Sequence, residues 1–148
     1  MTTTAPTTNG RVIALAHYAA RALLEGVLTR HGATFEQSVT LRAVVLAGDS
    51  VGRDELVSDV IGSLKTDESA VRAAIDELTA TKLLEQDPAE TSRLRLTDSG
   101  RELYETTTAE TAEISARLYA GIPAEDLAVA GRVLTLITQR ANAELAGA

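Results

Sequence analysis

The sequence predicts a mainly α-helical protein that contains one small β-hairpin. Apolar residues recur at three- and four-residue spacing over most of the chain, which is the period of an amphipathic helix. Only between Leu83 and Leu96 does the period change to two, the period of a half-buried strand. The 148 residues include one Phe, three Tyr and no Trp, so the core must be built mostly from Ala, Leu, Val and Ile.

The first half of the chain is expected to hold three helices. The first runs from Arg11 to about Arg30 and ends at the pair His31-Gly32, where glycine favours a left-handed cap. The second begins at Thr34, which forms a capping-box pattern with the glutamine three residues later. Residues 48–52 form a turn cluster, after which a third helix starts near Arg53 and ends near residues 62–64.

The second half is expected to hold a helix, the hairpin and two long helices. Thr66 or Asp67 caps the fourth helix, which ends near Lys82 and whose buried stripe has helical spacing: Val71, Ala74, Ile75 and Leu78. Residues 83–86 and 93–96 are the two strands, because Leu94 and Leu96 alternate with arginines. A fifth helix opens at residues 97–100 and ends at Gly121, and Pro123 is the first residue of the sixth.

A helix pair followed directly by a hairpin predicts a winged helix-turn-helix. The second helix of such a pair fits the major groove of DNA, where base edges are accessible. We therefore divide the chain into a disordered tail (1–10), an N-terminal dimerisation helix (11–32), a winged DNA-binding lobe (33–97) and C-terminal dimerisation helices (98–148). The flanking helices would join two copies and hold the two recognition helices about 34 Å apart.

Several short motifs, in this order and spacing, resemble the MarR (multiple antibiotic resistance regulator) family. Residues 94–103, LRLTDSGREL, are similar to that family's junction between wing and long helix, an LT-x-x-G-x-x-L pattern. Further similarities cover the entry of the second helix (34–37 with 41–42), the start of the third (54–57) and the exit from the recognition helix (78–85).

The resemblance implies a homodimeric transcriptional regulator that binds double-stranded DNA. The residues expected at the DNA are Lys65, Ser69, Arg72, Ala73, Asp76, Arg93 and Arg95. It also implies a cavity between the first helix and the winged lobe for a small aromatic or anionic effector that releases the DNA. The polar residues expected to line it are His17, Tyr18 and Arg42.

The chain departs from the family pattern within the lobe. The family often has arginine where this chain has Ala73 and Glu77, and glycine where it has Lys82. Thr91 and Ser92 occupy wing positions where paired arginines are typical. Arg93 and Arg95, which follow these two positions, are expected to replace in part the positive charge of the family's paired arginines.

Charge favours a second hypothesis. The chain carries a formal charge of −7, and residues 53–96 hold six basic against ten acidic side chains, a charge of −4. Because neutralisation of phosphates supplies most non-specific affinity for DNA, such a lobe should bind weakly or only to a favoured sequence. The alternative is an acidic winged-helix dimer that binds proteins.

Single residues also admit two interpretations each. Arg72 either reads a base or is a solvated side chain paired with Asp76. Thr66 and Ser69 either contact phosphate or cap the helix, with capping preferred for Thr66. His17 and its neighbours either line a ligand cavity or pack in an ordinary helix interface.

The sequence lacks the residues and motifs that enzymes, metal sites and cofactor-binding proteins need. The chain has no cysteine, so it has no thiolate metal site, thiol nucleophile or thiol redox sensor. Its two histidines lack metal-ligand spacing, and no phosphate-binding loop or nucleophile elbow is present. We therefore expect neither an enzyme nor a cofactor. The longest apolar run, residues 12–20, is too short to span a bilayer, and without a basic leader the expected location is the cytoplasm.

Overall fold

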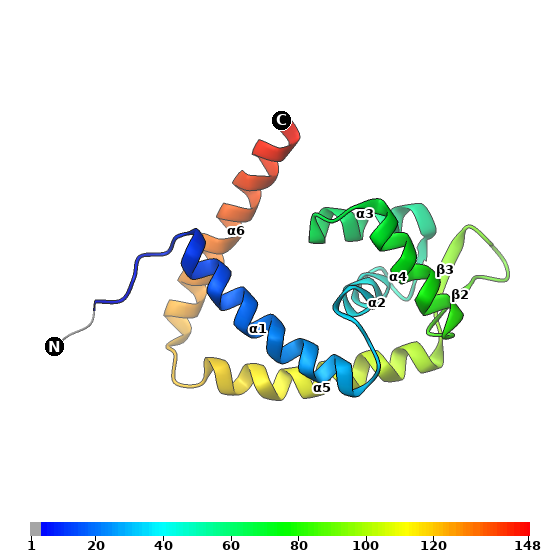
Figure 1. The fold of residues 1–148 in the computed structure, drawn as a ribbon, viewed down its shortest axis with the longest axis horizontal. Helices are drawn as coiled ribbons and strands as arrows, with labels where there is room; N and C mark the ends of the chain where they lie inside the picture. The colour runs from blue at the N-terminus through cyan, green and yellow to red at the C-terminus, as the bar shows by residue number, and fades with distance from the viewer. Residues whose placement is uncertain (1–3) are drawn as a thin grey trace. The chain divides into compact units, whose positions relative to one another are not determined.

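The computed structural model describes residues 4–148 and is mainly helical, as predicted (Figure 1). The helices are α1 (Gly10–Arg30), α2 (Phe35–Leu46), α3 (Arg53–Leu64), α4 (Glu68–Ala80), α5 (Asp98–Tyr119) and α6 (Ala124–Gly147). The strands are β1 (Ser50–Gly52), β2 (Leu84–Gln86) and β3 (Arg93–Leu96). The chain forms two compact units, one that extends to Glu113 and one from Ile114 to Ala148.

The helices begin where short polar side chains satisfy their first backbone N–H groups. The Asn9 side chain accepts from the Val12 backbone N at the start of α1. Thr34 and Gln37 form the predicted reciprocal capping box at α2. At α4 the cap is Asp67, whose side chain accepts from the Ala70 N, so of the two predicted caps Asp67 is confirmed and Thr66 is wrong.

The expected tail falls partly outside the described residues, which begin at residue 4. Residues 4–9 form neither helix nor strand, and α1 starts at Gly10. At the other end of the chain, Pro123 stands at the N-cap of α6 and Ala124 is the first helical residue. The two predicted helix starts, Arg11 and Pro123, are therefore each within one residue of the observed ones.

The hairpin is part of a three-stranded antiparallel sheet with β3 in the centre. Residues 50–52, predicted as the end of a turn cluster, instead form strand β1, in which Val51 lies opposite Leu94. The turn needs only Gly48 and Asp49, which both adopt a positive φ. Since Val51 and Leu94 are both buried, β1 gives the wing a second partner strand and an apolar underside.

A single core holds the lobe together. It is formed by α2, α3, α4 and the sheet, with these buried side chains: Leu41, Val44, Val51, Leu56, Val57, Val60, Val71, Ile75, Leu78, Leu84 and Leu94. The four predicted stripe residues of α4 are all buried. This packing fixes the rotation of α4 about its own axis and therefore determines which residues it presents to solvent.

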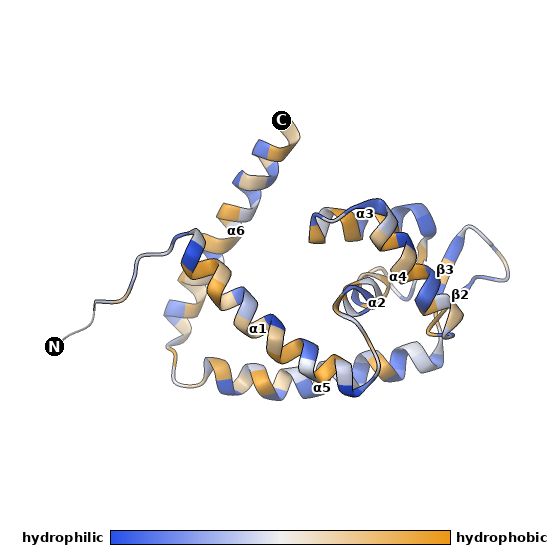
Figure 2. Ribbon diagram, in the orientation of Figure 1, coloured by the Kyte–Doolittle hydropathy of each residue, from blue (hydrophilic) through white to orange (hydrophobic). Residues whose placement is uncertain are grey.

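The ends of the chain carry exposed apolar surface. Among the residues that the structure describes, none in α6 is buried, although the helix is rich in valine, leucine and isoleucine (Figure 2). Its exposed large apolar residues are Val129, Val133, Leu134, Leu136, Ile137 and Leu145. α1 also exposes Leu15 and Leu23. Such apolar faces are typical of helices that pack against another chain.

α1 also differs from the sequence expectation about membranes. As a whole it is long and apolar enough to cross a bilayer, by length and composition alone, although its nine-residue run is too short. This is weak evidence, because packed helices of soluble proteins pass the same test. Arg21 and Glu25 form an ion pair on its surface, which is more typical of a helix in water.

Candidate nucleic-acid interface

α4 presents a narrow face of small residues opposite its buried stripe. With 3.6 residues per turn, the positions farthest from the core are Ser69, Ala73, Asp76 and Ala80, and all four are exposed. Three residues expected at DNA from the sequence, Ser69, Ala73 and Asp76, therefore lie on this face. The other exposed residues of the helix flank it.

Arg72 lies beside this face and is held by two carboxylates. Its Nη2 is 2.8 Å from the Glu68 carboxylate one turn earlier and 3.8 Å from Asp54 on α3. The hydrogen bond to Glu68, with the charge of both carboxylates, raises the pKa of the Arg72 guanidinium further. The alternative interpretation, in which Arg72 pairs with Asp76, is therefore wrong.

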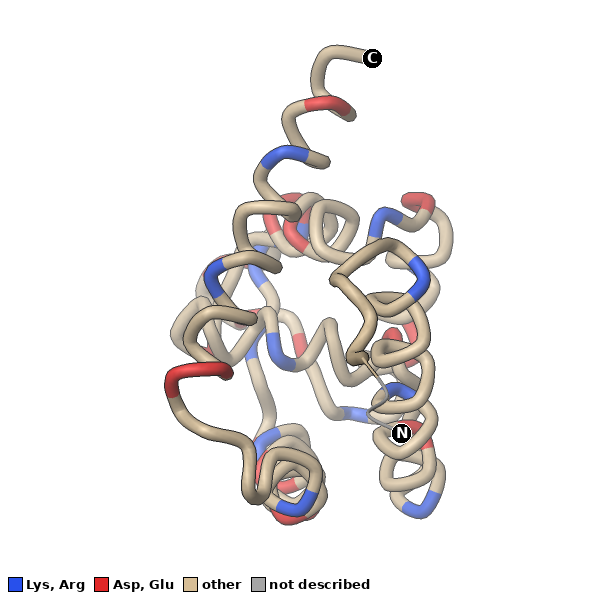
Figure 3. The backbone as a smooth tube through the Cα atoms, turned by 90° about the vertical axis from the view of Figure 1, so that its left-hand side faces the viewer, with Lys and Arg blue, Asp and Glu red and all other residues tan. Residues whose placement is uncertain are grey.

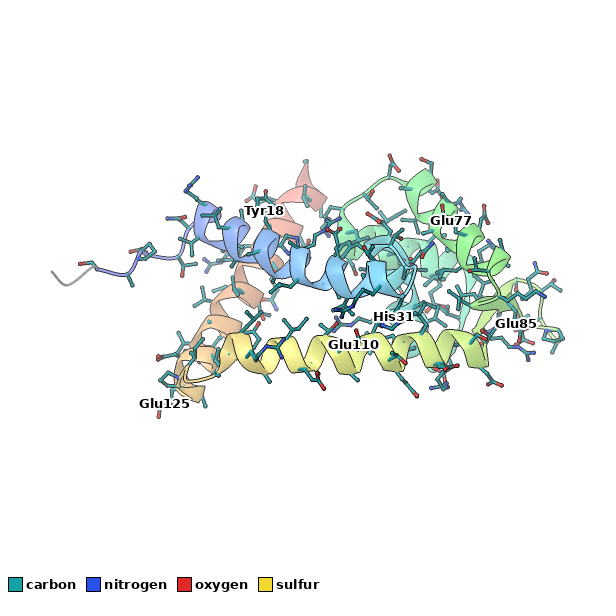
Figure 4. The ribbon with its side chains drawn as sticks, turned by 60° about the horizontal axis from the view of Figure 1, so that its bottom comes forward. Tyr18, His31, Glu77, Glu85, Glu110 and Glu125 are labelled. Atoms are coloured by element: carbon teal, nitrogen blue, oxygen red, sulfur yellow. The ribbon has the colours of Figure 1, made fainter. Side chains whose placement is uncertain are left out.

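Asp76 instead lies 3.7 Å from Nη1 of Arg53, the first residue of α3. The pair is asymmetric, because the Asp76 side chain is 75 % exposed and that of Arg53 only 31 %. On the other side of α4, the Glu77 carboxylate accepts a 2.9 Å hydrogen bond from the Gln37 amide of α2 (Figure 4 labels Glu77). Asp76 is therefore the carboxylate of α4 that projects from the small-residue face.

The wing arginines are also engaged. Arg95 Nε lies 2.7 Å from the carboxylate of Glu85, its register partner on β2. Arg93 Nε donates to the Ser50 hydroxyl at 3.2 Å and lies 4.0 Å from Glu90 in the wing loop. The alternation predicted for this strand is confirmed, since Leu94 between them is fully buried.

All four arginines of residues 53–96 thus have an acidic partner within 4.0 Å. Basic and acidic positions are interspersed along the backbone (Figure 3). The two lysines differ, since neither forms an ion pair within residues 4–148. Lys65 has a left-handed backbone at the end of α3 and its ammonium donates to the Gly62 carbonyl. Ser69, also expected at DNA, donates its hydroxyl to the Asp67 cap at 3.2 Å.

One hollow of the lobe was not predicted from the sequence. It has a volume of about 470 Å³ and is lined by Arg53, Thr79, Lys82, Leu84, Glu85 and Gln86. The lining comes from the start of α3, the end of α4, the turn that holds Lys82, and β2. No local sequence pattern predicts this hollow, because its lining residues lie about thirty positions apart and come together only in the folded lobe.

The three expected effector residues lie on two helices. Tyr18 is 65 % exposed on α1 (Figure 4), and its ring centroid is 6.0 Å from that of His17. Arg42 is exposed on α2, and within residues 4–148 its side chain forms no ion pair. The hollow described above includes none of the three, so their role as a ligand site stays a prediction. Residues 4–148 also contain no cluster of potential metal ligands.

Comparison with known proteins identifies the fold. No family model and no curated protein matches the chain. A MarR-family transcriptional regulator from Rhodococcus sp. RHA1 is 19 % identical, with a TM-score of 0.73 over 87 % of this chain and 92 % of that one. MepR of S. aureus, in complex with DNA, is 20 % identical, with a TM-score of 0.73 over 90 % and 96 %.

A further structure concerns the regulation of DNA binding of Bordetella bronchiseptica BpsR by 6-hydroxynicotinic acid. BpsR is 24 % identical, with a TM-score of 0.69 over 87 % of this chain and 97 % of that one. The matches span nearly the whole length of these proteins, so they include the helices on both sides of the lobe as well as the lobe itself. The chain therefore has the winged-helix fold of the MarR-family regulators.

Proposed function

We propose that the chain is a homodimeric transcriptional regulator that binds double-stranded DNA through α4 and the wing. The observation that carries the proposal is the exposed small-residue face of α4, set directly beside a three-stranded wing. Small side chains let a helix approach base edges closely in the major groove. The similarity in fold to the DNA-bound MepR supports the same use of these elements.

Dimerisation is part of the proposal. The apolar residues exposed on α6 and α1 suit burial against a second copy of the chain, since a monomer would leave them in water. Leu127, Leu134, Ile137 and Leu145 are expected to lose most of their exposure there. Light scattering at micromolar concentration tests this, and a monomeric mass would refute it.

DNA binding is tested by the recovery of genomic fragments on the purified protein at about 50 mM salt. The double variant R93A/R95A should weaken binding across all fragments, because these arginines lie on the wing. R11A removes one positive charge, half of that lost in R93A/R95A, from the exposed start of α1 and should have little effect. Failure to enrich any fragment would contradict the proposal.

The alternative is an acidic dimer that binds proteins. The charge of −4 over residues 53–96 and the carboxylate beside each of its arginines favour it. Enrichment of DNA fragments by the wild type, lost in R93A/R95A, would exclude it. We propose a cytoplasmic, non-catalytic protein in either case.

We also propose that a small aromatic or anionic molecule regulates the protein through His17, Tyr18 and Arg42. The similarity in fold to BpsR supports this class of effector. The test is a thermal-shift screen of aromatic acids against the wild type and R42A. An acid that stabilises both equally would remove Arg42 from the site.

A further inference from the structure

The groove-facing surface of α4 has the opposite chemistry to that of an arginine-bearing recognition helix. We propose that Asp76 is a specificity-determining residue that reads the amino group of a cytosine in the major groove. This inference rests on the proposed function, because it requires that α4 enters that groove.

The geometry leaves one charged group on this face. Ser69, Ala73 and Ala80 are short and uncharged, and Asp76 lies among them with three quarters of its side chain exposed. The charged neighbours on either side are held elsewhere, Arg72 by Glu68 and Glu77 by Gln37. A base edge that approaches this face therefore meets a hydrogen-bond acceptor.

The chemistry of the groove then selects among the bases. Only cytosine N4 and adenine N6 offer hydrogen-bond donors there, whereas guanine presents two acceptors and thymine one acceptor and a methyl group. Adenine also places its acceptor N7 next to N6, which repels the second carboxylate oxygen. Cytosine has no such acceptor on its groove edge, so an aspartate favours it over the other three bases.

Arg53 makes the placement of this carboxylate possible. Its backbone N donates to the Ser92 carbonyl at 2.9 Å, which ties the start of α3 to the wing. Its guanidinium, 3.7 Å from Asp76, offsets part of the repulsion between the carboxylate and the DNA phosphates. Arg53 is thus a positioning residue that leaves the outer side of the carboxylate open.

The test is selection of bound sequences from random DNA, with the full-length wild type, D76N, D76A and E77Q. The wild type should fix one C·G pair in each half-site. D76N should move that position to A·T by at least about fivefold, because asparagine pairs with both N6 and N7 of adenine. D76A should lose the preference there without gaining another, and every other position should be unchanged.

E77Q is the matched control. It also removes one negative charge, but at the neighbouring residue, whose carboxylate is held by Gln37. It should raise affinity through reduced repulsion and keep the C·G pair. If D76N and E77Q select the same sequences, the inference is overturned while the proposed function stands. If none of the four proteins binds DNA, both fail. Thermal melting of all four, expected to agree closely, excludes unfolding as the cause of a changed preference.

Discussion

Replacing Gly100 with alanine tests how α5 is attached to the lobe. A Cβ atom at this position would lie 2.1 Å from the Leu83 carbonyl oxygen and 2.8 Å from Cδ1 of Leu96. The leucine side chain can rotate away, but the carbonyl belongs to the backbone between α4 and β2. That same oxygen accepts from the Thr97 backbone N at 3.2 Å and from the Thr97 hydroxyl at 3.1 Å.

The loss of folding stability in G100A follows from the displacement of the Leu83 carbonyl. Overpacking against a fixed atom costs about 1–3 kcal/mol, and loss of the two hydrogen bonds costs about 0.5–1.5 kcal/mol each. Alanine returns at most about 1 kcal/mol through its better helix propensity. The net loss should be about 3 kcal/mol, a large share of the roughly 5–15 kcal/mol that stabilises an ordinary domain.

Urea denaturation followed by far-ultraviolet circular dichroism measures this loss. The matched control is G62A on α3, where an added Cβ meets no atom within 4 Å. G62A should leave stability unchanged or raise it by up to about 1 kcal/mol. A G100A protein as stable as G62A would refute the reasoning, because it would mean that the junction yields without cost.

Three further predictions concern charge and assembly. Hydrogen bonds from His31, which lies beside Glu110 in Figure 4, and from Arg30 lower the pKa of the Glu110 carboxyl. The wild type should therefore lose its stability advantage over E110Q as pH falls below about 4. Denaturation at several pH values between 3 and 7 measures this. I137E should shift the mass in light scattering from dimer to monomer, because a charge would be buried in the proposed interface. E68Q should remove the closer of the two carboxylates that hold the Arg72 guanidinium, and so raise affinity for DNA and steepen its salt dependence in fluorescence anisotropy. Equal titrations of E68Q and the wild type would contradict this.

Local signals were sufficient for the helices of the lobe. Thr34 with Gln37, and Asp67, satisfy N–H groups within three residues of their own position, so their effect is visible in the sequence. The stripe of α4 was equally visible because its spacing alone defines a face. Strand β1 was missed because three residues carry too little periodicity, and only pairing with β3 makes them a strand.

The contacts of the candidate interface residues were harder to predict than the helix that carries them. Arg72 has a carboxylate both four residues before it and four after it, so helix spacing cannot choose between Glu68 and Asp76. The choice is made by tertiary contacts, since α3 brings Arg53 to Asp76 and Asp54 to Arg72. The hollow beside the wing depends on the same packing.

These pairings change what the acidic charge of the lobe implies for DNA binding. A phosphate that reaches a paired arginine must displace a carboxylate, and the freed carboxylate then lies close to the DNA backbone. The exchange gains little from counterion release, which is the main source of affinity for non-specific DNA. Binding must then depend on hydrogen bonds to base edges, shape and the wing contacts, all of which require the correct sequence. An acidic lobe with paired arginines therefore lowers the affinity for non-specific DNA more than the affinity for a specific site. This charge distribution favours binding to few sites in a genome.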